Sequence, residues 1–342
     1  MIKYNFYNDY AEGAHASILE LLGNTNLKQE SGYGDDSYSL EAKKLIKQNL
    51  QNDNVDIHFV SGGTQANLIV LASMLKPYEA VISAETGHIN VHEAGAIEAT
   101  GHKICTVPSM DGKLTAEGIN TIVKAHTDEH MVKPKVVFVS NSTELGTIYN
   151  KAELTAISTY CKQNNLYLYL DGARLGSALM SSESDVTLED VCSLVDMFYI
   201  GGTKNGALIG EAIVIVNPSL KENFRYHLKQ RGALLAKGRV VALQFLALFT
   251  NNLYFDLAKN ANQKAEKLTK GITDLNFGFL TESTTNQIFP NKIVEELAKL
   301  YGFYIWKKVD SNNSAIRLVI SWATQSENVE TFLEDLKNLA KG

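Results

Sequence analysis

The chain has 342 residues, of which 45% are hydrophobic and 20% are charged, and its formal net charge is −6. This composition is typical of a globular protein and excludes a disordered or fibrous one. There is no basic run or tail, so we expect neither a nucleic-acid nor a membrane partner. The first six residues lack the apolar stretch of a signal peptide or membrane span, which favours a cytoplasmic protein. Cys105, Cys161 and Cys192 are widely spaced, and we expect reduced thiols that pack in the interior.

Short apolar runs rich in β-branched and aromatic residues alternate with helical patterns between residues 55 and 217. This alternation predicts an α/β fold in which helices cover a mostly parallel sheet. The predicted strands are 55–60, 80–83, 103–107, 135–139, 166–171, 197–200 and 211–216. The predicted helices include 65–75 and 151–164, where apolar residues recur at helical spacing.

The pattern changes after about residue 218. Long helical patterns cover 225–250 and 257–275, and a late strand is predicted at 316–320. A single core stops growing at roughly 250–300 residues, so a chain of this length has room for two units. We predict a large domain at 1–235, which includes an N-terminal arm, and a smaller α+β domain at 236–342.

One lysine lies among small, uncharged residues. Lys204 follows the apolar strand 197–200, with Gly201, Gly202 and Gly206 around it, which would let a bulky ligand approach the backbone. Burial disfavours the charged amine and so favours a neutral nucleophile. The alternative is an ordinary solvated lysine.

An aspartate ends the predicted strand at 166–171. Asp171 should stand at the carboxyl edge of the sheet, where open α/β sheets bind ligands. If the ligand contains a pyridine ring, a carboxylate there can keep the ring nitrogen protonated. The alternative is that Asp171 is the N-cap of a helix. Arg174, three residues on, could be a surface or ion-pair residue, or could reach a ligand oxygen or a substrate carboxylate.

The run Ser61–Asn67 joins a predicted strand to a predicted helix. Exposed amides at a helix N-terminus attract phosphate, which makes Gly63 and Thr64 candidate phosphate ligands. The pattern is weak alone, because it lacks both the Gly-x-Gly-x-x-Gly spacing and the P-loop ending.

His88 and His92 are four residues apart. A zinc pair is conceivable, but the glutamate follows the second histidine instead of lying between the two, so we expect no metal site. A better use of His88 is to stack on a ligand ring, with His92 structural or exposed.

Chemistry based on pyridoxal 5′-phosphate (PLP) needs a lysine for the imine, an acid at the pyridine nitrogen, a phosphate cradle and a stacking ring. Lys204, Asp171, the Ser61–Asn67 turn and His88 are candidates for these four roles. With Gly32–Asp36 and Glu93, they occur in an order that resembles the threonine aldolase branch of the fold-type I, aspartate aminotransferase-like PLP enzymes. The resemblance runs from Asn8 to Thr324.

The resemblance implies roles for particular residues. It assigns the imine to Lys204, the pyridine nitrogen to Asp171, stacking to His88, and the phosphate to Gly63 with Thr64. It also implies that Arg174 and Arg317 clamp the substrate carboxylate, since arginine offers a planar fork of donors. Tyr33 would reach into the neighbouring subunit's site, because the family's sites lie between the chains of a homodimer, usually paired into a homotetramer.

Some positions depart from the family's pattern. Asn8 replaces a serine that contacts the substrate carboxylate, and the segment Asn141–Gly146 carries Glu144 where many members have a histidine. The distal histidine that controls the β-hydroxyl together with His88 corresponds to His130 only through a one-residue shift. Arg231 and Arg239 compete as the arginine that binds phosphate across the dimer, and we favour Arg231.

The activity that the resemblance implies is cleavage of L-threonine or L-allo-threonine to glycine and an aldehyde. Two alternatives remain open at this point. The first is a PLP-dependent β-eliminating lyase acting on another amino acid, and the second is a catalytically silent PLP-binding dimer.

Overall fold

The computed structural model describes residues 2–291, 295–310 and 314–340. Its main feature is a seven-stranded sheet in the order β2-β8-β7-β6-β5-β3-β4. All neighbouring pairs are parallel except those made by β8, which runs antiparallel to β2 and β7. The strands are β2 (Asp56–Val60), β3 (Glu79–Ala84), β4 (Lys103–Val107), β5 (Lys133–Ser140), β6 (Tyr167–Asp171), β7 (Met197–Gly201) and β8 (Glu211–Ile215).

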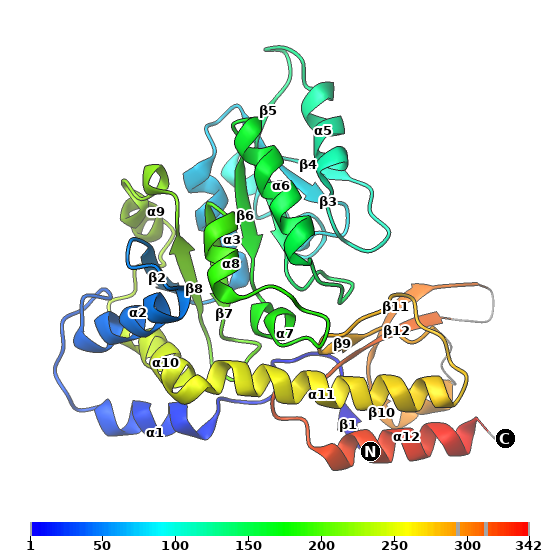
Figure 1. Cartoon of the computed structure of the whole chain (residues 1–342). Coiled ribbons are helices and arrows are strands. Elements are labelled where there is room, and N and C mark those ends of the chain that lie inside the picture. The colour runs from blue at the N-terminus through cyan, green and yellow to red at the C-terminus, as the bar shows by residue number, and fades with distance from the viewer. Residues whose placement is uncertain (1, 292–294, 311–313, 341–342) are drawn as a thin grey trace.

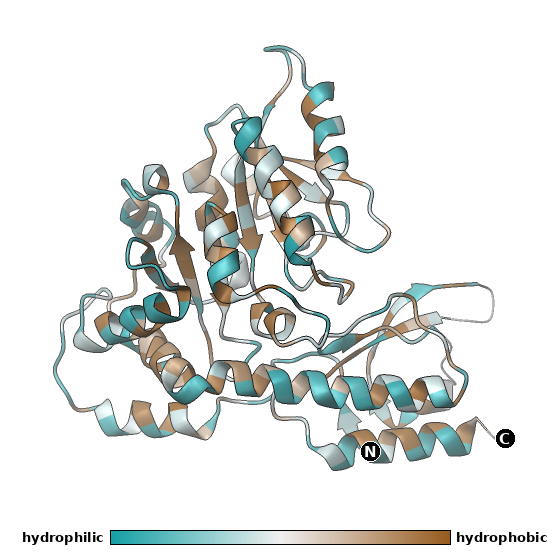
Figure 2. Cartoon of the chain, viewed as in Figure 1, coloured by the Kyte–Doolittle hydropathy of each residue, from teal (hydrophilic) through white to brown (hydrophobic). Residues whose placement is uncertain are grey.

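Successive strand residues point to opposite faces, and each face is covered by helices (Figure 1). One face packs on α3 (Gly63–Met74) and α9 (Phe224–Gln230). The other face packs on α2 (Ser37–Leu50), α5 (Ala116–Ala125), α6 (Lys151–Gln163), α8 (Leu188–Leu194) and α10 (Arg239–Phe249). The central strands are therefore hydrophobic along their length, whereas α2 alternates hydrophilic and hydrophobic residues (Figure 2). The helices α1 (Ala16–Thr25), α4 (His88–Val91) and α7 (Leu175–Leu179) complete this part.

A smaller α+β unit holds both ends of the described chain (Figure 1). It contains a three-stranded antiparallel sheet, β11-β12-β9, and a parallel pair made by β1 with β10. Its elements are β1 (Tyr4–Asn5), β9 (Gln287–Ile288), β10 (Tyr301–Gly302), β11 (Tyr304–Lys308), β12 (Ser314–Val319) and α12 (Ser326–Leu339). The hydrophobic core of this unit includes Phe6, Leu318 and Phe332.

The long helix α11 (Leu253–Asp274) passes beneath both parts (Figure 1). Its first turns place Tyr254 and Leu257 in the core of the large unit, and its later turns place Ala261, Leu268 and Ile272 in the small one. The packing therefore favours a division within α11. The division at residues 235/236 stays a prediction, and α10, which follows it in the chain, packs in the large unit's core.

The predicted alternation of strands and helices is confirmed, and every predicted strand overlaps an observed one. The continuous helical pattern at 225–250 is wrong: it forms α9 and α10, separated by a loop in which Gly232 has φ +69°. Such a φ ends a helix at little cost only for glycine. The three cysteines are free and buried, as expected.

One stretch, Arg239–Asp274, is long and apolar enough by composition to cross a membrane. It is not one continuous helix, because Asn251 and Asn252 have φ of 52° and 62° and separate α10 from α11. Most of its apolar segment is packed inside the molecule, as expected of core helices.

Candidate active site

The carboxyl ends of the parallel strands bring the chemically interesting side chains to one edge of the large sheet. The loops after β2, β3, β5, β6 and β7 carry Gly63, His88, Glu144, Asp171 and Lys204. Since these strands run in the same direction, loops separated by more than a hundred residues in sequence meet at this edge.

Two glycines allow the loops that carry Asp171 and Lys204 to lie against each other. A Cβ on Gly172 would collide with the Tyr199 carbonyl oxygen, and a Cβ on Gly201 would collide with the Ala173 carbonyl oxygen. Any larger side chain at either position would push the two loops apart.

Lys204 makes no hydrogen bond or ion pair with the described residues. Burial and then the Arg174 guanidinium lower the pKa of its amine, while Asp9, Asp171 and Glu211 oppose the shift. A lowered pKa increases the fraction of neutral amine, which is the nucleophilic form.

The Asp171 carboxylate is held in place by hydrogen bonds. Its Oδ1 accepts from the Tyr199 hydroxyl at 2.6 Å and from the Ala173 backbone N–H at 2.9 Å. Its Oδ2 accepts from the Asn67 amide at 3.0 Å. The side chain is buried and faces the site instead of capping a long helix, because α7 begins only at Leu175.

A second carboxylate orients His88. The His88 Nδ1 lies 2.8 Å from Glu93 Oε1, and the same oxygen accepts from the Asn67 amide at 2.7 Å. An ionised carboxylate can only accept, so Nδ1 carries the proton and Nε2 is the free ring nitrogen. Asn67 thus connects the orientation of His88 with that of Asp171.

The amino end of α3 has unsatisfied amides. The N-cap Gly62 makes no side-chain cap, and the backbone N–H groups of Gly63 and Thr64 find no acceptor among the described residues. The helix has 12 residues, so its dipole adds a positive field at the same place. A Cβ on Gly63 would lie 3.0 Å from the Tyr199 hydroxyl, so the helix start is packed closely against the Asp171 network.

Arg174 is bound by a residue from the N-terminal arm. Its Nε and Nη2 donate to the two carboxylate oxygens of Asp9 at 2.7 and 3.1 Å, and Asn286 also donates to Asp9 at 2.9 Å. Burial alone would raise the pKa of Asp9, but Arg174 and Lys204 outweigh it and hold that pKa below its usual value. The Nη1 of Arg174 is the guanidinium nitrogen that does not bind Asp9.

Arg317 comes from β12 in the small unit. Its guanidinium lies 5.1 Å from the centre of the Trp306 ring and 5.6 Å from that of Tyr304, and its buried Nε has no partner among the described residues. Burial and then Arg174 lower its pKa. Asn8 lies beside Asp9, and its side chain accepts the Tyr10 backbone N–H at 3.0 Å.

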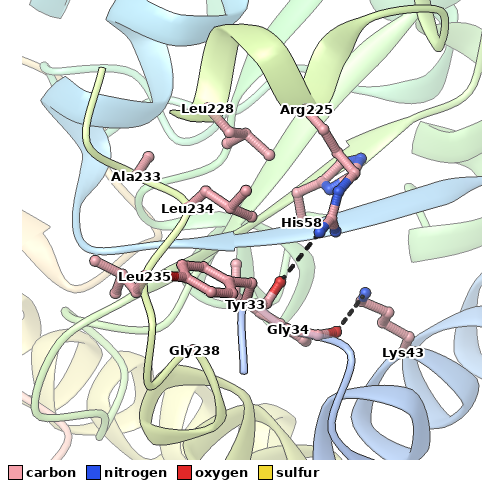
Figure 3. Close-up of a pocket in the computed structure, with 11 residues that line it drawn as sticks. Tyr33, Gly34, Lys43, His58, Arg225, Leu228, Ala233, Leu234, Leu235 and Gly238 are labelled. Carbon is pink, nitrogen blue, oxygen red and sulfur yellow. Dashed lines mark hydrogen bonds between the residues drawn. The ribbon is translucent and has the colours of Figure 1, made fainter. Parts of the chain in front are cut away.

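Tyr33 does not face Lys204 of its own chain. It lies with Gly34 in a pocket at the outer strand β2, where its carbonyl accepts from Arg225 and the Gly34 carbonyl accepts from Lys43 (Figure 3). The residue is 44% exposed, and its ring lies 4.7 Å from the Lys229 ammonium.

The two competing arginines lie in different places. Arg239 begins α10. It lies near the loop that carries Tyr33, because the Tyr33 backbone N–H donates to the Ala236 carbonyl. Arg231 lies at the end of α9, where it contacts His227 and Gln230, and its charge acts on His102, which is bound near the far end of α3. Arg239 donates to the backbone carbonyls of Asn26 and Lys28, which precede the Tyr33 loop in the chain.

His130 is not brought to the cluster within one chain. It is exposed in the loop before β5, where its backbone N–H donates to Asp128 at 3.0 Å. This loop lies at the amino end of β5, at the top of Figure 1, whereas the cluster lies at the carboxyl ends of the strands. The polar run that contains His130 is a surface loop.

Sequence reasoning gave no role to several residues at this edge, although it named Glu93 and Asn67 within motifs. Asp9, Asn67, Glu93, Tyr199 and Glu211 all contact the predicted residues or act on their charges. Glu211 accepts the Gly202 backbone N–H, and burial raises its pKa to about 8. A usable signal existed for Glu211, because it is a charged residue that begins an otherwise apolar strand.

Comparison with known proteins decides the family. The family model described as beta-eliminating lyase matches residues 11–293. This chain belongs to the beta-eliminating lyase family. A low-specificity L-threonine aldolase of Pseudomonas aeruginosa is 32% identical, covering 97% of this chain and 96% of the relative. The predicted resemblance is thereby confirmed at the level of the family, and the chain is a lyase.

Solved structures agree with this family assignment. A threonine aldolase of Leishmania major is 46% identical, covers 98% of this chain and 99% of its own, and superposes with a TM-score of 0.97. A mutant aspartate aminotransferase of Thermus thermophilus is 13% identical, covers 99% and 91%, and has a TM-score of 0.73. The second likeness concerns the fold alone, and it confirms the predicted aspartate aminotransferase-like architecture.

Proposed function

We propose that this protein is a PLP-dependent threonine aldolase that cleaves L-threonine and L-allo-threonine to glycine and acetaldehyde. The observation that carries the proposal is that Lys204, which has no hydrogen-bond or ion-pair partner among the described residues, lies with a fixed Asp171 at the carboxyl edge of the sheet. The likeness to low-specificity threonine aldolases over nearly the whole chain supports this activity.

The residues at this edge fit PLP. The free amides of Gly63 and Thr64 would hold the phosphate, and Lys204 would form the covalent link. Asp171 would face the pyridine nitrogen, and the His88 ring, oriented by Glu93, would stack on the cofactor. When bound, PLP supplies an electron sink for a carbanion at the substrate Cα.

The substrate carboxylate would be held between the two units. Arg317 offers the outer Nη donors of its guanidinium, of which Nη2 also reaches the Tyr7 carbonyl oxygen at 3.4 Å, and Arg174 offers the Nη1 that does not bind Asp9. Asn8 is close enough in the chain to Asp9 to add a polar contact at the same place. Anchoring the carboxylate orients the substrate and so selects the bond that breaks.

Asp9 and Arg174 have a second task in this proposal. The pair fixes the guanidinium beside Lys204, where its charge helps to lower the pKa of the lysine amine. Lys204 is then a neutral nucleophile and can accept a proton nearer neutral pH than an ordinary lysine can.

The proposal includes a homodimer or homotetramer with shared sites. Tyr33 is exposed, and its backbone N–H donates to the Ala236 carbonyl, three residues before Arg239, so both residues are candidates to complete the neighbouring subunit's site. We therefore assign the cross-subunit phosphate contact to Arg239 in place of Arg231. A cytoplasmic location stays a prediction.

Product analysis tests the activity. The purified enzyme, supplied with PLP, is incubated with L-threonine and separately with L-allo-threonine, and glycine and acetaldehyde are quantified. We expect equal amounts of the two products from the wild type and none from Lys204→Ala, which cannot form the covalent link.

Two results would contradict the proposal, and each points elsewhere. A keto acid with ammonia would identify a β-eliminating lyase, which is the other activity that the family's name describes. PLP bound through Lys204 with no product from either diastereomer would indicate a protein that binds the cofactor without turning over these substrates.

A further inference from the structure

Glu144 carries a carboxylate at the edge of the site, and it has no role in the function proposed so far. It lies in the loop that follows β5, and its Oε1 accepts the His88 backbone N–H at 3.0 Å and the Ser140 hydroxyl at 2.8 Å. One donor ends β5 and the other begins α4, the helix that follows β3, so the position of the carboxyl group is fixed by the packing of β3 beside β5.

The second oxygen of Glu144 is free. The described residues offer no hydrogen-bond partner to Oε2. The atom is not enclosed by the protein, so a ligand can reach it. By contrast, Glu93 Oε2 is enclosed and unpaired. Glu144 therefore presents one accessible acceptor on the His88 side of the site.

The charged and titratable groups that act on Glu144 belong to the site. Burial and then Asp171 raise the pKa of Glu144, and His88 opposes the shift. The charge of Glu144 in turn acts on Arg174 and on Tyr149, which follows it on the same loop. A carboxylate whose pKa lies above the usual range is a better base than an ordinary one when it is ionised.

We propose that Glu144 accepts the β-hydroxyl proton of the substrate as the Cα–Cβ bond breaks. This inference rests on the proposed aldolase function and names the base for it. The oxygen keeps the electron pair of the O–H bond and forms the aldehyde C=O, and the proton moves to Glu144 Oε2. The pair of the Cα–Cβ bond stays on Cα, where a proton completes glycine, so threonine gives glycine and acetaldehyde with no other reactant.

Other groups at the edge are less suited to this role. Asp171 already accepts three hydrogen bonds from the described residues. His88 keeps a free Nε2, but its ring is held by Glu93 through Nδ1 and is assigned above to stacking on the cofactor. His130 lies in the loop at the opposite ends of the strands. Glu144 is the carboxylate that is both fixed and open.

The test compares two reactions of the same enzyme. Cleavage of L-threonine requires removal of the hydroxyl proton, whereas exchange of the glycine α-proton with solvent deuterium involves no hydroxyl group. Glu144→Gln keeps the shape and the two accepted hydrogen bonds but removes the base. We expect kcat for cleavage to fall about 100- to 1,000-fold, while glycine exchange and PLP content stay within about twofold of wild type.

Two controls and a direct titration accompany the comparison. Glu129→Gln removes an exposed carboxylate beside His130 and should leave both reactions unchanged. Ser140→Ala removes one donor to Oε1 and should lower cleavage by less than Glu144→Gln does. Difference infrared spectroscopy should show a carboxyl group, distinct from that of Glu211, that titrates above the usual glutamic acid range in the wild type and is missing in Glu144→Gln.

The pH dependence of kcat should have a definite direction. Glu144 must be ionised to accept the proton, so kcat of the wild type should fall as pH drops through its raised pKa, and this acid limb should be absent from the residual activity of Glu144→Gln. Cleavage near the wild-type rate in Glu144→Gln would overturn the inference, and so would equal loss of cleavage and exchange. A wild type that exchanges the glycine proton but releases no aldehyde would overturn the aldolase proposal itself.

Discussion

At the scale of single residues, the Asp9–Arg174 pair ties the N-terminal arm to the catalytic loop. Both side chains are almost completely removed from water, with side-chain exposures of 0% and 13%. An ion pair of this kind contributes little relative to apolar residues, but loss of one partner leaves an uncompensated buried charge. The pair should therefore be far more sensitive to a single substitution than a surface pair would be.

We expect Asp9→Asn to lower the free energy of unfolding by about 3 kcal/mol at pH 7. Burial alone would raise the pKa of Asp9, but Arg174 and Lys204 lower it overall, so the native state binds this proton less readily than the unfolded chain. The stabilisation is therefore complete above the usual carboxyl pKa and disappears as pH falls through the lowered value.

Urea unfolding of protein stripped of cofactor, at several pH values, measures this difference. The curves of Asp9→Asn and wild type should converge in acid, and the exposed Asp53→Asn should match wild type throughout. A constant difference at all pH values would show that packing, and not charge, sets the effect.

Sequence reasoning proposed Lys204, Asp171 and His88 because each stands after an apolar strand or beside glycines, and the structure places all three at one edge of the sheet. It could not identify Asp9 or Asn67 as members of the site, because their roles depend on contacts across 165 and 104 residues of chain. The role of His130 stays a prediction: within one chain, the direction of β5 places its loop at the edge opposite to the cluster.

At the scale of elements, the start of α3 combines the proposed phosphate site with a tight contact. Gly62 and Gly63 are adjacent, yet a Cβ on Gly62 would meet nothing within 4 Å, whereas one on Gly63 would press on the Tyr199 hydroxyl. Tyr199 in turn donates to Asp171. The two glycines therefore form a matched pair of test positions.

We expect Gly63→Ala to raise the dissociation constant of PLP about tenfold, which corresponds to about 1.4 kcal/mol, because the added methyl group displaces Tyr199 from Asp171. Gly62→Ala should change it by less than about twofold, since its φ of −178° is extended backbone that alanine adopts. Equilibrium dialysis of PLP against both variants measures the difference. Equal affinities for the two variants would contradict the contact.

The elements themselves were partly predictable. Buried parallel strands such as β5 read as apolar runs, and these runs were found. The reversed direction of β8 could not be read from its sequence, because a central strand buried on both faces looks alike in either direction. The split between α9 and α10 depends on a single backbone angle at Gly232.

At the scale of the whole molecule, shared sites make a specific demand on mixtures of variants. If Lys204 and Arg239 of one site come from different chains, Lys204→Ala and Arg239→Ala are each inactive or nearly so as homodimers. A mixed dimer, however, has one site in which both residues are intact.

We expect a mixture of equal amounts of these two variants, allowed to exchange subunits, to recover roughly a quarter of wild-type activity, since half of the dimers are mixed and one site in two is intact. Cleavage of L-threonine after mixing measures the recovery. The pair Lys204→Ala with Asp171→Asn should recover none, because both residues belong to one chain's site. Equal behaviour of the two mixtures would place Arg239 in its own chain's site.

The helix α11 limits where this chain can be joined to a relative's chain to make a chimaera. Its early turns pack in the core of the large unit, which carries Lys204, and its later turns pack in the core of the small unit, which carries Arg317. The boundary between the two cores therefore falls within a helix and not in a loop. A chimaera joined at a surface loop near residue 235 would leave the apolar side of α10 to be matched by a foreign partner. Exchange of the carboxylate-binding unit between relatives would require a junction inside a continuous helix, with the helical phase preserved across it.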